Sequence, residues 1–167
     1  LRDPETVSAI FARFQEDPVG LTLTARATAL ALSLIAFPAV YFMARRLWGR
    51  REASLAVTLL ALSPLHLDLS RVARVDAPCA AFTIAAMWLA LRYLDAPSRS
   101  RFALMGITAG AAAAFKEYGG GIVLPIMLLV MTARSSRHRF VIAAAHGALA
   151  LLSFVAFFPF MLLEYGE

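Results

Sequence analysis

Six apolar runs follow one another along the chain, and short polar stretches separate them. The runs span residues 21–44, 52–67, 77–94, 102–115, 122–133 and 140–163. A helix needs about 20 apolar residues to cross the hydrocarbon core of a bilayer, and the first and last runs exceed this length. The pattern predicts an all-α, polytopic membrane helix bundle with about six membrane segments. Pro38 is expected to kink the first segment.

Residues 1–20 show a different pattern, which is typical of an amphipathic helix. From Val7 to Phe14, apolar side chains recur at helical spacing and form one stripe. Such a helix can lie in the membrane interface, or it can pack on another part of the protein. We therefore divide the chain into a juxtamembrane segment of an outer loop, residues 1–20, and a transmembrane helix bundle, residues 21–167.

The fourth and fifth runs are each too short to cross a membrane. The polar, glycine-rich stretch from Lys116 to Gly121 separates them. A single span would bury Lys116 and Glu117 near mid-membrane, at a cost of about 2.5–3.5 kcal/mol for the lysine. Two short helices that meet at the glycine turn avoid this cost. The Gly106–Gly110 pair would let a neighbouring helix approach closely.

Charged residues alternate between the two ends of the predicted segments. The connections at residues 45–51, 92–101 and 134–139 are rich in arginine, which favours a cytoplasmic position. Nearly all of the acidic residues gather in the other connections and near the ends of the chain. We therefore predict an integral membrane protein whose acidic side is non-cytoplasmic.

Composition supports this interpretation, since 60% of the 167 residues are hydrophobic and only 16% are charged, unlike a soluble domain. The net charge of +5 does not indicate nucleic-acid binding, because the basic residues lie between apolar runs rather than on one face. The single cysteine, Cys79, cannot form an intrachain disulfide. The sequence has no P-loop, dinucleotide fingerprint, nucleophile motif or metal-ligand spacing. Because the chain does not begin with Met, we expect an internal part of a larger membrane protein.

The stretch 65–78 concentrates polar side chains between two apolar runs. Asp76 can cap the helix that follows. It can also be a catalytic carboxylate at the outer mouth of the bundle, where it would help to hold a metal ion, a phosphate-bound cation or an acceptor hydroxyl. Arg71 and Arg74 lie one helical turn apart and could bind a phosphate, whose oxygens match guanidinium groups. A local ion pair between Asp68 and Arg71 is the alternative.

Lys116 lies on the same predicted side of the membrane as Asp76. Short, glycine-interrupted membrane segments often line a binding cavity, so Lys116 could neutralise a phosphate there. An ion pair with Glu117 in a hydrated loop is the alternative. His66, His138 and His146 do not cluster in the sequence, and we interpret them as structural.

Three pairs of motifs resemble the membrane glycosyltransferases related to dolichyl-phosphate-mannose–protein mannosyltransferases, a group with the GT-C fold that includes the bacterial aminoarabinose transferase. The pairs are ARATAL (25–30) with VYFMARRLWG (40–49), LSP (62–64) with SRVARVD (70–76), and GITAG (106–110) with AFK (114–116). The likeness covers most of residues 21–130 and depends on the order and spacing of short motifs. Phe115 and Glu117 depart from the residues that the family has around its lysine.

The resemblance implies a transferase that uses a polyprenyl-phosphate sugar on the outer face of a membrane, which in a bacterium is the inner membrane. It matches Asp76 to the second outer-loop Asp of the family, Lys116 to its Lys near the lipid phosphate, and Arg26 to an Arg of the first block. The main catalytic base would lie before Leu1, so we expect this segment alone to be inactive. The resemblance leaves open whether a divalent metal ion serves as a cofactor, and it does not identify the acceptor.

The implied reaction places clear demands on the side chains. An acceptor hydroxyl attacks the anomeric carbon, a carboxylate takes its proton, and the lipid phosphate leaves. Cationic groups must stabilise the charge that develops on this phosphate, and Arg26, Arg71, Arg74 and Lys116 are the candidates. We therefore expect Lys116, Asp76 and at least one of Arg71 and Arg74 to converge on one outer cavity.

Two other classes of function stay open at this point. The chain could be part of a multipass transporter, in which the short helix pair would gate a substrate. It could also be a membrane scaffold without catalytic activity. An inverted repeat of the six segments elsewhere in the protein would favour the transporter.

Overall fold

The computed structural model describes residues 8, 12, 15–72, 74–133 and 138–158 of the chain. Within these residues every element is a helix, which confirms the predicted all-α class. The elements are α2 (Pro18–Ser33), α3 (Ala36–Leu47), α4 (Arg50–Leu62), α5 (Pro64–Arg71), α6 (Asp76–Asp95), α7 (Arg99–Phe115), the 3-10 helix η1 (Glu117–Ile122), α8 (Val123–Ala133) and α9 (Arg139–Phe157). Twelve of the residues 1–20 lie outside the described residues, so the amphipathic helix predicted there stays a prediction. The predicted boundary after residue 20 is wrong, because Asp17 caps α2 and Pro18 begins it.

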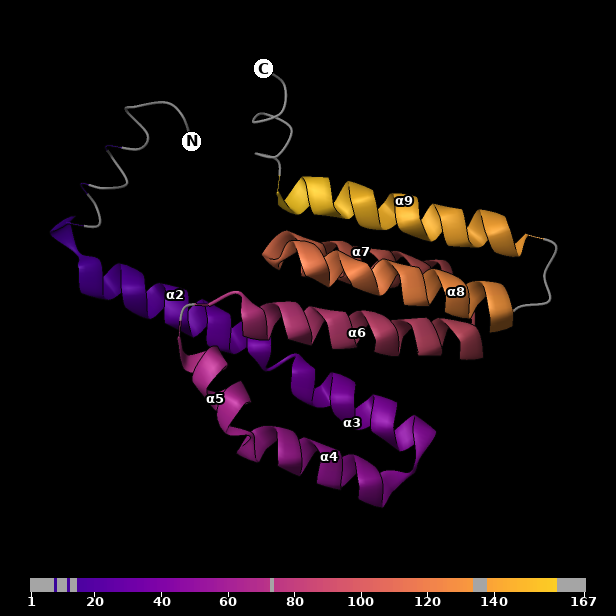
Figure 1. Ribbon diagram of the computed structural model, residues 1–167, viewed down its shortest axis with the longest axis horizontal. Coiled ribbons are helices and arrows are strands. Elements are labelled where there is room, and N and C mark those ends of the chain that lie inside the picture. Colours follow the sequence, from indigo (N-terminus) through magenta and orange to yellow (C-terminus); the bar gives the residue numbers. More distant parts are fainter. Residues whose placement is uncertain (1–7, 9–11, 13–14, 73, 134–137, 159–167) are drawn as a thin grey trace.

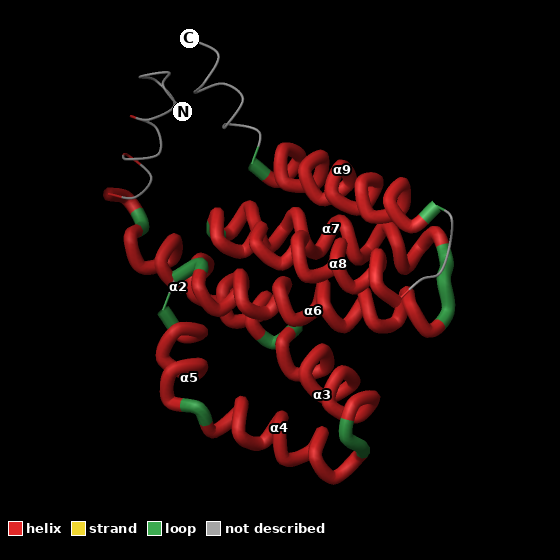
Figure 2. Tube along the Cα trace, turned by 45° about the vertical axis from the view of Figure 1, so that its right-hand side comes forward, coloured by secondary structure: helices red, strands yellow, loops and turns green. Residues whose placement is uncertain are grey.

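The helices α6, α7, α8 and α9 run side by side, and α3, α4 and α5 form a second group against α6 (Figure 1). Figure 2 shows the same two groups from another angle. One end of the bundle holds the α3–α4 and α6–α7 connections together with the start of α9, and we call it the basic end. The start of α6, the η1 turn and α5 lie at the opposite end, which we call the Asp76 end. This arrangement agrees with the predicted alternation of charge.

Three helical stretches are long and apolar enough to cross a membrane among the residues that the structure describes. They are residues 18–47, which comprise α2 and α3, the whole of α6, and the whole of α9. The α4–α5 pair would add a fourth if it counts as one span, and its two helices are bent by 56° at their junction. The helices α7 and α8 are joined through η1, as predicted for two short helices. The total of about six membrane segments stays a prediction.

Two prolines explain where the first long helices are interrupted. The break between α2 and α3 falls at Leu34 and Ile35, and the carbonyl of Leu34 is the one that the missing N–H of Pro38 would have bonded. The predicted kink is therefore confirmed one turn before its proline. Pro64 begins α5, with Ser63 as the N-cap whose Oγ accepts a hydrogen bond from the backbone N–H of His66 at 3.3 Å. The second apolar run is thus broken in two, and its second helix continues to residue 71.

Close packing of α7 against α9 depends on two glycines of α7. A Cβ added to Gly106 would lie 2.6 Å from side-chain atoms of Leu149. A Cβ added to Gly110 would lie 2.5 Å from the carbonyl oxygen of Ala150 and 2.5 Å from the Cβ of Ser153. These separations are far below van der Waals contact, so the predicted role of the glycine pair is confirmed.

The core between α6, α7, α8 and α9 is built largely from small side chains. Its buried members are Ala86, Ala90, Tyr93, Met105, Ala109, Ile126, Val130 and Ala150. Small residues allow helix backbones to approach closely, which is a main source of helix association inside a membrane. The packing therefore holds α6 and α7 at a fixed separation.

Candidate functional site

Asp76 is the centre of an ionic cluster at the start of α6. The Nζ of Lys116 donates a hydrogen bond to its Oδ1 at 2.5 Å, and the hydroxyl of Tyr118 donates to the same oxygen at 3.1 Å. The Nε of Arg74 lies 3.4 Å from its Oδ2. We call these four residues the Asp76 cluster. It joins the start of α6 to the connection between α7 and η1.

The expectation that Asp76 caps α6 is wrong. Val75 occupies the N-cap position, and no side chain there makes a capping hydrogen bond. The carboxylate instead meets Lys116, which is 40 residues further along the chain. The alternative of a Lys116–Glu117 ion pair is also wrong, because Lys116 bonds to Asp76. A charge-assisted bond of this kind is among the stronger polar interactions in proteins.

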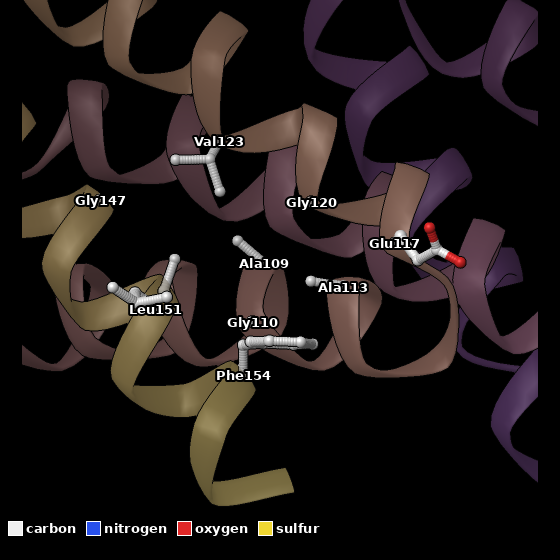
Figure 3. Close-up of a pocket in the computed structure, with 10 residues that line it drawn as sticks. Ala109, Gly110, Ala113, Glu117, Gly120, Val123, Gly147, Leu151 and Phe154 are labelled. Atoms are coloured by element: carbon white, nitrogen blue, oxygen red, sulfur yellow. The ribbon is translucent and has the colours of Figure 1, made fainter. Parts of the chain in front are cut away.

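The backbone at Lys116 explains why two adjacent charged residues face different surroundings. Lys116 is a single extended residue between α7 and η1, with φ −157° and ψ 136°. Successive side chains on extended backbone point to opposite sides. Lys116 therefore reaches Asp76, whereas Glu117 lines a separate hollow of about 330 Å³ between α7, η1, α8 and α9 (Figure 3). Every other side chain that lines this hollow is apolar or belongs to glycine.

Gly119 holds η1 close to the two helices that carry the cluster. A Cβ at this position would overlap the carbonyl oxygen of Ala112 on α7 and would lie 2.8 Å from the Sγ of Cys79 on α6. A larger residue would therefore push η1 outward. The tight packing fixes the distance between Asp76 and Lys116.

A hollow of about 260 Å³ lies beside the cluster, between α2, the start of α6 and the end of α7. Arg74 belongs to both the cluster and this hollow. The other lining residues are apolar except for one threonine: Ala25, Thr28, Ala29, Leu32, Val75, Pro78 and Phe115. The arrangement offers a cationic edge next to an apolar wall, which suits an amphiphile with a negatively charged head.

Lys116 stays charged in this setting. The hydrogen bond to Asp76 raises the pKa of Lys116 above its ordinary value, and the neighbouring Tyr118 raises this pKa further. The ammonium also lies 4.9 Å from the centroid of the Tyr118 ring, within the range of a cation–π interaction. The side chain of Lys116 is 37% exposed and that of Asp76 is 21% exposed. A ligand can thus reach a cation that is already oriented.

Two predicted site residues do not join the cluster. The Nη2 of Arg71 lies 2.9 Å from the Oδ1 of Asp68, and both side chains are well exposed. The local ion pair that the sequence offered as an alternative is therefore the one formed. Arg26 lies exposed on α2 and makes no hydrogen bond or ion pair within the described part of the chain. Asp76, Lys116 and Arg74 contact one another as expected, although of these three only Arg74 lines the neighbouring hollow. Their roles toward a phosphate stay predictions.

Tyr118 is the member of the cluster that the sequence did not assign a role. The sequence feature that could have indicated a role for Tyr118 is its position two residues after Lys116, because an aromatic side chain in a polar turn is exposed. Its hydroxyl and its ring both contact the cluster, so it supports the geometry of the Asp76–Lys116 pair.

A metal site does not form from the side chains in view. Among the residues with described positions, no three His, Cys, Asp or Glu side chains come close enough to hold an ion. Asp76 follows Val75, which lines the hollow of about 260 Å³, and its two oxygens already face Lys116, Tyr118 and Arg74. The donors within the described part of the chain therefore do not by themselves fit a divalent metal ion.

Comparison with known proteins identifies a family. The family model of dolichyl-phosphate-mannose-protein mannosyltransferases matches residues 19–162, which is most of the chain. Neither the curated proteins nor the solved structures contain a significant match. The matched region includes the whole Asp76 cluster.

Proposed function

Because the chain belongs to the dolichyl-phosphate-mannose-protein mannosyltransferase family, we propose that it acts within a membrane glycosyltransferase of the GT-C type. The donor is a polyprenyl-phosphate sugar, and transfer takes place on the non-cytoplasmic side. The observation that carries this proposal is the pair of cations, Arg74 and Lys116, on either side of one carboxylate and next to an apolar hollow. A lipid phosphate has the matching chemistry, since it joins a negatively charged head to an apolar chain.

The cluster acts on the leaving phosphate in this mechanism. The acceptor hydroxyl attacks the anomeric carbon of the sugar, forming the new glycosidic bond as the bond from that carbon to the phosphate oxygen breaks. The ammonium of Lys116 and the guanidinium of Arg74 stabilise the charge that develops on the phosphate. Because Lys116 is already oriented by Asp76, little reorganisation is needed at the moment of reaction.

Asp76 acts as a positioning residue in this scheme. Both of its oxygens already face cations, so the proton of the acceptor hydroxyl goes to a different carboxylate. By the resemblance given in the sequence analysis, that carboxylate would lie before Leu1. Asp76 instead keeps the two cations at the edge of the hollow, where the donor phosphate arrives. The acceptor and the sugar are not specified by these contacts.

The experiment that tests the proposal measures sugar transfer from a polyprenyl-phosphate donor by the full-length protein in its membrane. Lys116→Met should lower kcat by about 100-fold or more, which is typical for the removal of one group that stabilises transition-state charge. Lys116→Arg should restore part of the rate because it restores the charge. Asp76→Asn should lower the rate less, because the cations remain but lose their orientation.

Arg51→Gln provides a matched control, since it removes one positive charge at the basic end, away from the cluster. It should leave the transfer rate unchanged. Wild-type rates in both Lys116→Met and Asp76→Asn would remove the cluster from the mechanism. A loss of activity in Arg51→Gln as large as that in Lys116→Met would point to general loss of charge instead.

A further inference from the structure

A third hollow lies at the basic end of the bundle, far from the Asp76 cluster. It has a volume of about 430 Å³ and is formed by the α6–α7 connection and the first two turns of α9. Its lining residues are Tyr93, Pro97, Ser98, Arg99, Phe102, Val141, Ile142 and Ala145. The rings of Tyr93 and Phe102 lie 5.7 Å apart and form part of the wall. The hollow is thus mostly apolar, and the polar side chains that line it belong to Tyr93, Ser98 and Arg99.

Arg99 brings an uncompensated positive charge to this hollow. No acidic residue lines it, and Arg99 forms no ion pair within the described ranges. The nearest acid along the chain, Asp95, is held in a two-pronged bond by Arg46, whose Nε and Nη2 lie 2.7 Å and 2.6 Å from its two oxygens. Arg92 and Arg101 also act on Asp95 electrostatically. The surroundings of the hollow therefore carry a clear excess of positive charge.

The polar edge of the hollow also presents hydrogen-bond donors. Ser98 caps α7, and its Oγ accepts a hydrogen bond from the backbone N–H of Arg101 at 3.2 Å. The first N–H groups of a helix have no acceptor inside the helix, and those of α7 begin at Arg99. The hydroxyls of Ser98 and Ser100 lie 3.2 Å apart at the same edge. Together with the guanidinium, these groups form a set of donors that matches phosphate oxygens.

We propose that this hollow binds an anionic phospholipid of the leaflet that faces the basic end. The phosphate lies at Arg99 and the start of α7, and one acyl chain lies along Phe102, Ile142 and Ala145. The apolar wall favours a lipid over a free phosphate, because burial of apolar surface contributes only when an acyl chain is present. The surplus of arginines favours an anionic headgroup over a zwitterionic one, whose choline they would repel.

The test uses the full-length protein in detergent, titrated with phosphatidylglycerol or phosphatidylcholine. Bound lipid is counted by native mass spectrometry, and the unfolding midpoint is recorded in parallel. Phosphatidylglycerol should bind and raise the midpoint more than phosphatidylcholine. Arg99→Gln should weaken its binding about tenfold, as expected for the loss of one charge-assisted hydrogen bond. Inorganic phosphate should not displace the lipid.

Two pairs of variants make the result specific. Val141→Glu places a negative charge on the wall at an exposed position and should weaken phosphatidylglycerol binding, whereas Val141→Gln should weaken it much less. Arg51→Gln removes a charge at the same end outside the hollow and should bind like wild type. The proposal would be overturned if the two lipids bound equally, or if Arg99→Gln and Arg51→Gln lost the same amount of phosphatidylglycerol affinity. Displacement of the lipid by inorganic phosphate would also overturn it. Circular dichroism of every variant verifies that it is folded.

Discussion

Replacing Gly110 with alanine tests how α7 and α9 pack. The new Cβ would lie 2.5 Å from the carbonyl oxygen of Ala150, and an ordinary contact needs 3.4 Å, so the helices must separate by about 0.9 Å. Two of the three nearest atoms belong to the backbone of α9, which cannot rotate away as a side chain can. Overpacking of this kind costs about 1–3 kcal/mol, and we take the upper value. Alanine returns about 1 kcal/mol as a better helix former than glycine. The net loss of unfolding free energy is about 2 kcal/mol.

The assay is unfolding in mixed micelles, followed by circular dichroism and by tryptophan fluorescence. Gly147→Ala is the matched control, because it makes the same chemical change in α9. The nearest atom to its new Cβ is the Sδ of Met127 at 3.4 Å, which is an ordinary contact. This variant should be as stable as wild type or slightly more stable. If Gly110→Ala proves as stable as Gly147→Ala, the close approach of the two helices is not present in the protein.

Three further predictions concern the Asp76 cluster and one helix cap. Tyr118→Phe keeps the ring beside Lys116 but removes the hydroxyl bonded to Asp76. The kcat/KM for the donor should fall about fivefold, because one hydrogen bond contributes ~1 kcal/mol. An unchanged kcat/KM would contradict the supporting role of Tyr118. Ser63→Ala removes the cap of α5 and should lower the free energy of unfolding by about 1 kcal/mol. The control Ser54→Ala, at an exposed site within α4, should change this free energy by less than about 0.5 kcal/mol. Equal effects of the two variants would argue against the cap. Because Asp76 raises the pKa of Lys116, the stability from this pair is fully present below the ordinary lysine pKa of about 10.4 and is lost as the pH rises through the raised value. Unfolding curves recorded through that pH range should show this loss of stability in the wild type and not in Lys116→Met. An identical pH dependence of stability in both proteins would refute the contribution of the Lys116–Asp76 pair.

The helical architecture could be predicted because the bilayer restricts what each stretch can do. Lys116 and Glu117 are too expensive to bury in a single span, so the sequence alone favoured two short helices, and α7, η1 and α8 have that form. The glycines of α7 repeat at the spacing of close helix contacts, and α9 lies against them. These features depend on local pattern and on chain length, which a sequence displays directly.

The partners of the charged residues were harder to predict. Asp68 and Arg71 pair within one helix, so their spacing was sufficient. Asp76 offered an equally good local role as a cap, yet its partner comes from 40 residues away. The partner of Asp76 depends on how α6 and α7 pack and on where η1 begins. Neither can be deduced from the spacing of residues along the chain. The Arg46–Asp95 pair, 49 residues apart, escaped prediction for the same reason.

The extended backbone at Lys116 also makes the length of this connection matter as much as its composition. Deleting Lys116 would place Glu117 at the extended position and turn its carboxylate toward Asp76. The two carboxylates would then repel each other within the Asp76 cluster. Homologous proteins with the same arrangement should therefore differ there by substitution and almost never by a single-residue gap.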